Sequence, residues 1–137
     1  MLNLDQLAAK TAQAIVEAAA GSPKELDILV TKTLGVLQEN GVYAAVLFLQ
    51  SRTQKKEKEL APKIEAQLFS ALSDLLPESR NAQDKLQFVA DNIAGHLDTL
   101  LLVKQLWEQI LIYTRYGAKA AQASQSAAAS ETSPAQT

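Results

Sequence analysis

The chain has no cysteine and a single histidine, His96, among its 137 residues. Thiolates and imidazoles are the usual zinc ligands, so a site built from cysteines or from two histidines is excluded. A lone histidine beside a glycine is more often a helix-end or surface residue than a catalytic base. The lack of cysteine also excludes a disulfide framework and is typical of cytoplasmic proteins. We predict that the protein uses no metal or other cofactor.

Residues arranged for catalysis are scarce as well. The five glycines are isolated, so they form no glycine-rich loop that could cradle a phosphate. The serines lack the strand–turn–helix setting that exposes a nucleophile. The carboxylates are spread along the chain at spacings that suit solvated helix faces. The sequence therefore predicts that the protein is not an enzyme.

Long apolar runs and a strong net charge are also missing. None of the apolar runs approaches the roughly 18 residues that would identify a membrane span, and the N-terminus lacks the blocks of a signal peptide. The formal net charge is -2, which gives no overall attraction to nucleic acid. We predict a soluble, cytoplasmic protein in which any contact with a polyanion depends on a local basic patch.

What the sequence does contain is helical periodicity. Apolar residues make up 47% of the chain and aromatic residues only 5%, which predicts one mainly aliphatic core. Large apolar side chains recur at spacings of three and four, the spacing of a helix face, from Leu4 to about Ala118. We therefore predict an all-α protein, a single compact bundle of five or six helices over residues 1–120. Residues 121–137 are Ala- and Ser-rich without a large apolar side chain, which predicts a disordered tail.

The central segment of this pattern is the apolar run from Val42 to Leu49. The Asn40-Gly41 pair before it is a hairpin signal when strands flank it, but the preceding segment has helical spacing. Gly41 is therefore expected just past a helix end, in a conformation with positive φ. The run after it would form a second helix that is apolar on every side. We expect this helix to lie in the middle of the bundle, buried there or against another subunit.

Other helix ends have local signals. Ser22-Pro23-Lys24-Glu25 has the form of a capping box with proline at the first helical position. Ala61 precedes Pro62, which disfavours helical geometry and predicts a break there. Asn81 is the favoured cap of the next helix. Gly95 either breaks the following helical region or is tolerated within it, and the sequence leaves both possibilities open.

The feature that most suggests a partner is a basic run after the central segment. Five of the 13 basic residues fall within 12 positions, among only two acids: Arg52, Lys55, Lys56, Lys58 and Lys63. The run is either a solvated linker or a patch that contacts phosphates without reading sequence. It lacks interleaved aromatic residues, so it does not imply base stacking. Arg115 and Lys119 form a weaker cluster, which could instead complement the dipole at the end of the last helix.

The segment from Leu34 to Arg52 resembles the signature of the small all-helical subunit of type III-B CRISPR RNA-guided effector complexes, the Cmr complexes. In that family a helix ends in an Asn-Gly-like pair, and an Ala-rich apolar helix closing in Ser-Lys or Ser-Arg follows. The matching elements here are Asn40-Gly41, Ala44-Ala45, Phe48-Leu49 and Ser51-Arg52. Near the end of the domain, Tyr113 to Ala118 is similar to the family's Trp-Leu-Lys-Arg-Phe-Ala type segment. There Arg115 and Tyr116 match, while Thr114 and Gly117 depart from the pattern.

The resemblance implies a non-catalytic structural subunit in antiviral defence, present in several copies that stack along guide and target RNA. Its partners would be the RNA, other subunits and neighbouring copies of itself. The resemblance carries an RNA-contacting role onto Arg52, Lys55, Lys56 and Arg115, and the basic clusters add Lys58, Lys63 and Lys119. The alternative is a helical adaptor that binds only other proteins.

Overall fold

The computed structural model describes residues 3–132, and in this part of the chain the prediction of an all-α bundle is confirmed. Six α-helices and one 3₁₀-helix form there, without a strand. They are α1 (Leu4–Ala18), α2 (Pro23–Asn40), α3 (Val42–Gln50), α4 (Lys55–Leu75), η1 (Pro77–Asn81), α5 (Lys85–Asn92) and α6 (Leu97–Thr132). None of these helices combines the length and apolar character needed to cross a membrane.

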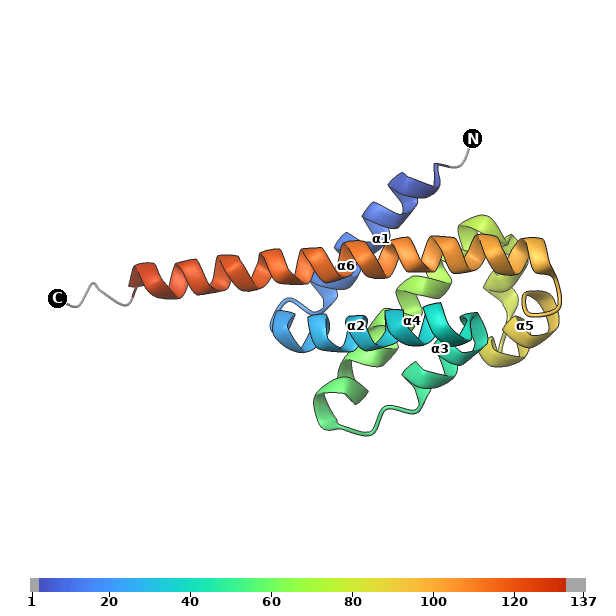
Figure 1. Cartoon of the computed structure of the whole chain (residues 1–137), viewed down its shortest axis with the longest axis horizontal. Coiled ribbons are helices and arrows are strands. Elements are labelled where there is room, and N and C mark those ends of the chain that lie inside the picture. The colour runs from blue at the N-terminus through green and yellow to red at the C-terminus, as the bar shows by residue number, and fades with distance from the viewer. Residues whose placement is uncertain (1–2, 133–137) are drawn as a thin grey trace.

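The longest helix, α6, runs along the whole bundle and packs mainly on α1 and α2 (Figure 1). α2 lies antiparallel to it, because Lys104 reaches the carbonyl near the end of α2 while Lys119 reaches Asp27 near its start. α1 crosses α6 at a steep angle. The connection between α3 and α4 lies at the edge of the molecule away from α6. This leaves the basic run of α4 and the basic residues of α6 in different parts of the molecule.

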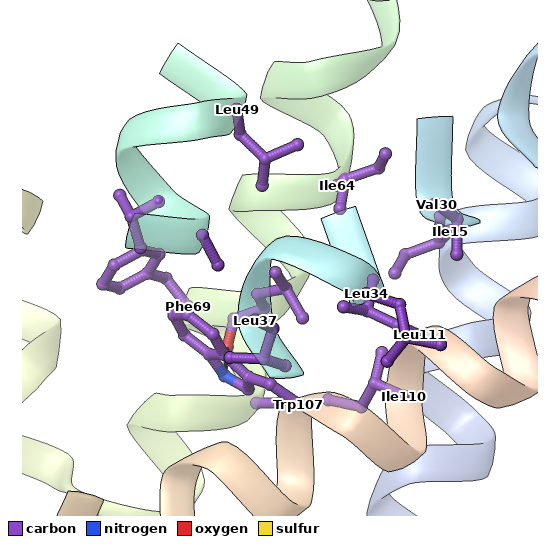
Figure 2. Close-up of a cluster of buried hydrophobic side chains, with 14 of the residues drawn as sticks. Ile15, Val30, Leu34, Leu37, Leu49, Ile64, Phe69, Trp107, Ile110 and Leu111 are labelled. Carbon is purple, nitrogen blue, oxygen red and sulfur yellow. Dashed lines mark hydrogen bonds between the residues drawn. The ribbon is translucent and has the colours of Figure 1, made fainter. Parts of the chain in front are cut away.

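The core is aliphatic around one buried tryptophan. Trp107 is 0% exposed, and its indole nitrogen donates a hydrogen bond to the Leu68 carbonyl of α4 at 3.1 Å. The Phe69 ring meets it edge-on, with the ring centroids 5.4 Å apart. The core extends from this pair through aliphatic side chains of α1, α2, α3, α4 and α6 (Figure 2). The predicted aliphatic core is confirmed.

Gly41 joins α2 to α3 and has φ +95, the only positive φ in the described chain. Its N–H donates to the Leu37 carbonyl and its own carbonyl accepts from Ala45, so the residue closes one helix and opens the next. The predicted role of Gly41 is confirmed. Side chains with a Cβ rarely adopt this conformation, whatever the free space around them.

We expect Gly41→Ala to lower the free energy of unfolding by about 1–3 kcal/mol through backbone strain. Gly35→Ala is the matched control. Gly35 lies inside α2, and a methyl group there would meet no atom within 4 Å. The control change should therefore stabilise the protein by about 0.5–1 kcal/mol. Denaturant unfolding checks both values, and equal effects at the two glycines would contradict the conformational role of Gly41.

α3 does not lie in the middle of the bundle, so that part of the prediction is wrong, while burial of the helix against another subunit stays a prediction. The helix has nine residues, of which Val42, Ala45, Val46 and Leu49 are buried at spacings of three and four. The opposite face carries Tyr43 and Leu47, and Leu47 is 48% exposed. One buried stripe is enough to hold so short a helix. The apolar residues of its outer face remain uncovered by this chain.

The predicted break before Pro62 is also wrong. α4 continues through Pro62, and Ala61 is helical and buried. Because Leu60, Ala61 and Ile64 all contribute to the core, packing outweighs the local preference of a residue before proline. Pro62 has no N–H, so the Lys58 carbonyl four residues earlier lacks its usual helical donor.

The predicted helix starts and capping residues are confirmed only in part. α2 begins after Ser22 with Pro23 first, as predicted, but the Ser22 side chain makes no capping hydrogen bond. Asn81 does not cap α5. Asp84 does so instead, and it accepts a hydrogen bond from the Gln87 N–H at 3.1 Å. Gly95 lies in a break, because α5 ends at Asn92 and α6 begins at Leu97.

α6 ends later than the sequence predicts, since it continues beyond residue 120 to Thr132. Its extension contacts the start of α2. The Gln122 amide lies 3.5 Å from the Pro23 carbonyl and 3.4 Å from an Asp27 oxygen, and Gln125 donates to the Ala20 carbonyl at 3.3 Å. The last part of the predicted tail, residues 133–137, lies outside the described residues.

Candidate nucleic-acid interface

Arg52 is fixed at the corner between α3 and α4. Its guanidinium carbon lies 3.8 Å from the centroid of the Phe48 ring, and its Nε donates to the Phe48 carbonyl at 2.9 Å. Another guanidinium nitrogen lies 3.6 Å from a Glu57 oxygen. The side chain is only 24% exposed. Most of its donors are therefore occupied within the fold.

Glu57, on the first turn of α4, is the carboxylate that holds this corner. The residue is 7% exposed, and its second oxygen accepts from Lys32 of α2 at 2.9 Å. One buried carboxylate thus bridges Arg52 and Lys32, which belong to different parts of the bundle. Such a carboxylate needs its cations, because an unpaired buried charge is costly.

We expect Glu57→Ala to lower the free energy of unfolding by about 1–3 kcal/mol, because Arg52 loses a partner in a half-buried position. The control is Glu59→Ala on the same helix turn. Glu59 is half exposed and pairs with Lys56 at 3.4 Å. A surface pair of this kind is worth about 0–1 kcal/mol. A Glu57 effect no larger than the Glu59 effect in thermal or denaturant unfolding would contradict the bridging role.

The lysines of the run divide into two groups. Lys55, Lys56 and Lys58 are exposed in the first turn of α4, and only Lys56 among them has an ion pair in the described structure. Lys63 is half-buried and donates to the Ala18 carbonyl at 3.1 Å. It therefore ties α4 to the end of α1. The surface that remains for a polyanion is Lys55, Lys56 and Lys58, which we call the α4 lysine patch.

The second predicted cluster does not join this patch. Arg115 and Lys119 belong to α6, and the α3–α4 connection lies at the edge of the molecule away from this helix (Figure 1). Lys119 pairs with Asp27 at 3.2 Å, while the buried Nε of Arg115 has no hydrogen-bond partner in the described chain. Because α6 continues to Thr132, neither residue lies in its last turn. The interpretation that they complement the helix dipole is therefore wrong.

A cavity of about 320 Å³ adjoins the patch between the end of α3 and α4. Its lining combines two cations with polar acceptors and small apolar groups: Leu49, Gln50, Arg52, Lys58, Ala61, Pro62 and Glu65. The Gln50 amide donates to Glu65 at 2.7 Å across it. Gln50 and Glu65 could not be identified from the sequence, because their pairing depends on how α3 folds back on α4.

A second, mostly apolar groove of about 670 Å³ lies between α1 and α6. It is lined by Ala9, Ala12, Gln13, Val16, Glu17, Tyr113, Tyr116 and Gly117. The helices approach closely there, since a Cβ on Gly117 would lie 3.0 Å from a Val16 methyl carbon. The Tyr113 hydroxyl donates to Asp5, and this hydrogen bond raises the pKa of the tyrosine above 10.0. The lining of this groove contains no cation, so the groove does not favour the binding of a polyanion.

Within residues 3–132 no cluster of three or more His, Asp or Glu side chains is placed to hold a metal ion. Comparison of the chain with family models, with curated proteins and with solved structures finds no match.

Proposed function

We propose that the chain is a non-catalytic structural subunit of a type III-B CRISPR RNA-guided effector complex. It would work in the cytoplasm in antiviral defence, in several copies stacked along guide and target RNA. The proposal starts from the resemblance of residues 34–52. In the fold this segment comprises the second half of α2, the Gly41 junction, α3 and the corner that carries Arg52. The α4 lysine patch follows directly.

The observation that carries the proposal is the position of these lysines. Lys55, Lys56 and Lys58 occupy the first turn of α4, where the positive end of the helix dipole disfavours cations. The three lysine side chains are exposed and take no part in the core, so the fold does not explain why cations stand at this helix start. The same turn adds the dipole to three ammonium groups, so its attraction for a phosphate is strengthened.

The patch suits a grip on the RNA backbone that ignores sequence. The aromatic residue nearest to these lysines in sequence is Phe48, and Arg52 lies over its ring. Lysine is a flexible point charge that contacts phosphates without reading bases. In RNA-guided complexes base pairing reads the sequence, while protein holds the backbone and shape. A subunit of this kind should therefore contribute affinity without specificity.

Exposed apolar pairs support contacts with other subunits. Tyr43 and Leu47 lie one turn apart on the outer face of α3, and Leu97 and Leu101 lie one turn apart on α6. Apolar residues grouped on an exposed face favour protein contacts. The same observation favours the second candidate function, a helical adaptor that binds only proteins. The two candidates differ in whether RNA is bound.

Isolation of the native protein under mild conditions tests the proposal. We expect it to copurify with other protein subunits and with RNA of defined length. Binding to RNA should weaken steeply as the salt concentration rises, whereas docking between proteins should respond much less. Copurifying proteins without RNA at low salt would favour the adaptor and contradict the RNA-guided assembly.

A further inference from the structure

The cavity between α3 and α4 offers more than positive charge. Its volume of about 320 Å³ falls at the lower end of ligand pockets, which span roughly 300–1,000 Å³. Lys58 lines it, is exposed and has no ion pair within the described structure. An anion entering the cavity would therefore meet a lining that contains two cationic residues, Lys58 and Arg52.

Residues that can supply hydrogen-bond acceptors line the same cavity. Pro62 lines the cavity and lacks an N–H, so the Lys58 carbonyl is left without its helical donor. Glu65, one turn further along α4, presents a carboxylate that accepts from Gln50 and lies 3.9 Å from Lys85. A carboxylate has room for several donors. A phosphodiester group alone would not use these acceptors, because it carries no hydroxyl donor.

The cavity lining offers both cations and hydrogen-bond acceptors. A ligand that matches both carries a phosphate and a neighbouring hydroxyl. We propose that the cavity binds one ribose–phosphate unit of single-stranded RNA. Lys58 contacts the phosphate, and the ribose 2′-hydroxyl donates its single hydrogen either to Glu65 or to the Lys58 carbonyl. No aromatic residue lines the cavity, so the base stays outside and free to pair. This inference rests on the proposed function and adds a preference for RNA over DNA.

The test compares two 20-nucleotide probes, oligo-uridine and oligo-deoxyuridine, which differ only in the 2′-hydroxyl. The full chain is immobilised densely, so that each probe contacts several copies. We expect the apparent Kd for the RNA probe to be about 3–10-fold lower than the apparent Kd for the DNA probe. This is the ratio that one net hydrogen bond gives. The 2′-hydroxyl is the group through which proteins distinguish RNA from DNA.

Glu65→Ala gives opposite results for the two possible roles of this carboxylate. If Glu65 acts only as a negative charge near the phosphates, its loss strengthens the binding of both probes equally. If it accepts from the ribose, the RNA advantage falls toward 1 while DNA binding does not weaken. Glu59→Ala is the matched control, because Glu59 lies on the same helix outside the cavity. It should leave the ratio between the two probes unchanged.

Pro62→Ala provides a second variant that does not endanger the fold. Alanine restores an N–H to the Lys58 carbonyl and is the better helix former, so α4 should become more stable. If the Lys58 carbonyl is the acceptor, the RNA advantage falls in this variant because the carbonyl is then occupied. Equal affinity of the wild-type chain for both probes, or an unchanged ratio in both variants, overturns the ribose site alone. Failure of the wild-type array to retain either probe overturns the proposed RNA-binding function and the site with it.

Discussion

Replacement of Trp107 by alanine should lower the free energy of unfolding by about 3–5 kcal/mol. Trp107 is the largest fully buried side chain, and its ring joins α6 to α4 through Phe69 and the Leu68 carbonyl. The change opens a large cavity in an interior that can relax only partly. For a domain whose total stability is about 5–15 kcal/mol, this loss is a large fraction.

The measurement is denaturant unfolding followed by circular dichroism, since Trp107 is the only tryptophan and the variant lacks its fluorescence. Tyr116→Ala is the control, an aromatic truncation on the same helix where the side chain is 65% exposed. It should change stability by no more than about 0.5 kcal/mol. A Trp107 effect below about 1 kcal/mol would show that α6 does not pack on α4 as described.

The helical bundle could be predicted because its signal is local and repeated. The buried residues of α2, from Leu26 through Leu29 and Val30 to Leu37, keep the spacing of one helix face. Gly41 was predictable for a similar reason, since a glycine between two helical segments has a single common use. In both cases the sequence pattern and the tertiary structure favour the same conformation.

Predictions from local sequence preferences were wrong where tertiary packing determines the conformation or the burial of a residue. At Ala61 the neighbouring proline disfavours a helix, but the burial of α4 against the core outweighs that preference. On α3 the sequence could not separate the buried Val46 from the exposed Leu47, because both are apolar. Which apolar face is covered depends on the position of α2 and α4. A pattern of residue types contains no information of that kind for so short a helix.

The sequence predicted the position of the basic segment, but it did not predict which of its side chains face solvent. The density of lysines located a basic segment over residues 52–63 but not the start of α4, and Arg52 and Lys63 turn inward to Glu57 and Ala18. The partner that completes the Glu57 bridge is Lys32, 25 positions earlier in the chain. Such pairings arise only when helices distant in sequence meet. The three lysines left facing solvent are therefore a result of the fold.

These three lysines give the test with the largest expected effect on binding. Replacing Lys55, Lys56 and Lys58 together by glutamine should weaken the retention of single-stranded RNA alike for all sequences. Each lost phosphate contact should reduce the slope of log K against log salt by roughly 0.7, or by about 2 for three contacts. The corresponding loss of affinity at low salt is on the order of 100-fold. Assembled complexes or dense arrays should be used, because one patch offers few contacts.

A matched control separates the patch from net charge. Replacing the exposed Lys10, Lys24 and Arg80 by glutamine changes the formal charge from -2 to -5 (-2 minus 3), as the patch variant does. The control should lose much less affinity. At physiological salt, the attraction between two charges is largely screened when they lie more than about 8–10 Å apart. Both variants should fold, since all six side chains lie on exposed surfaces. If the patch variant keeps its affinity and salt slope while assembly is intact, the lysines are a solvated surface. The protein-only adaptor would then become the better explanation of the exposed apolar faces on α3 and α6.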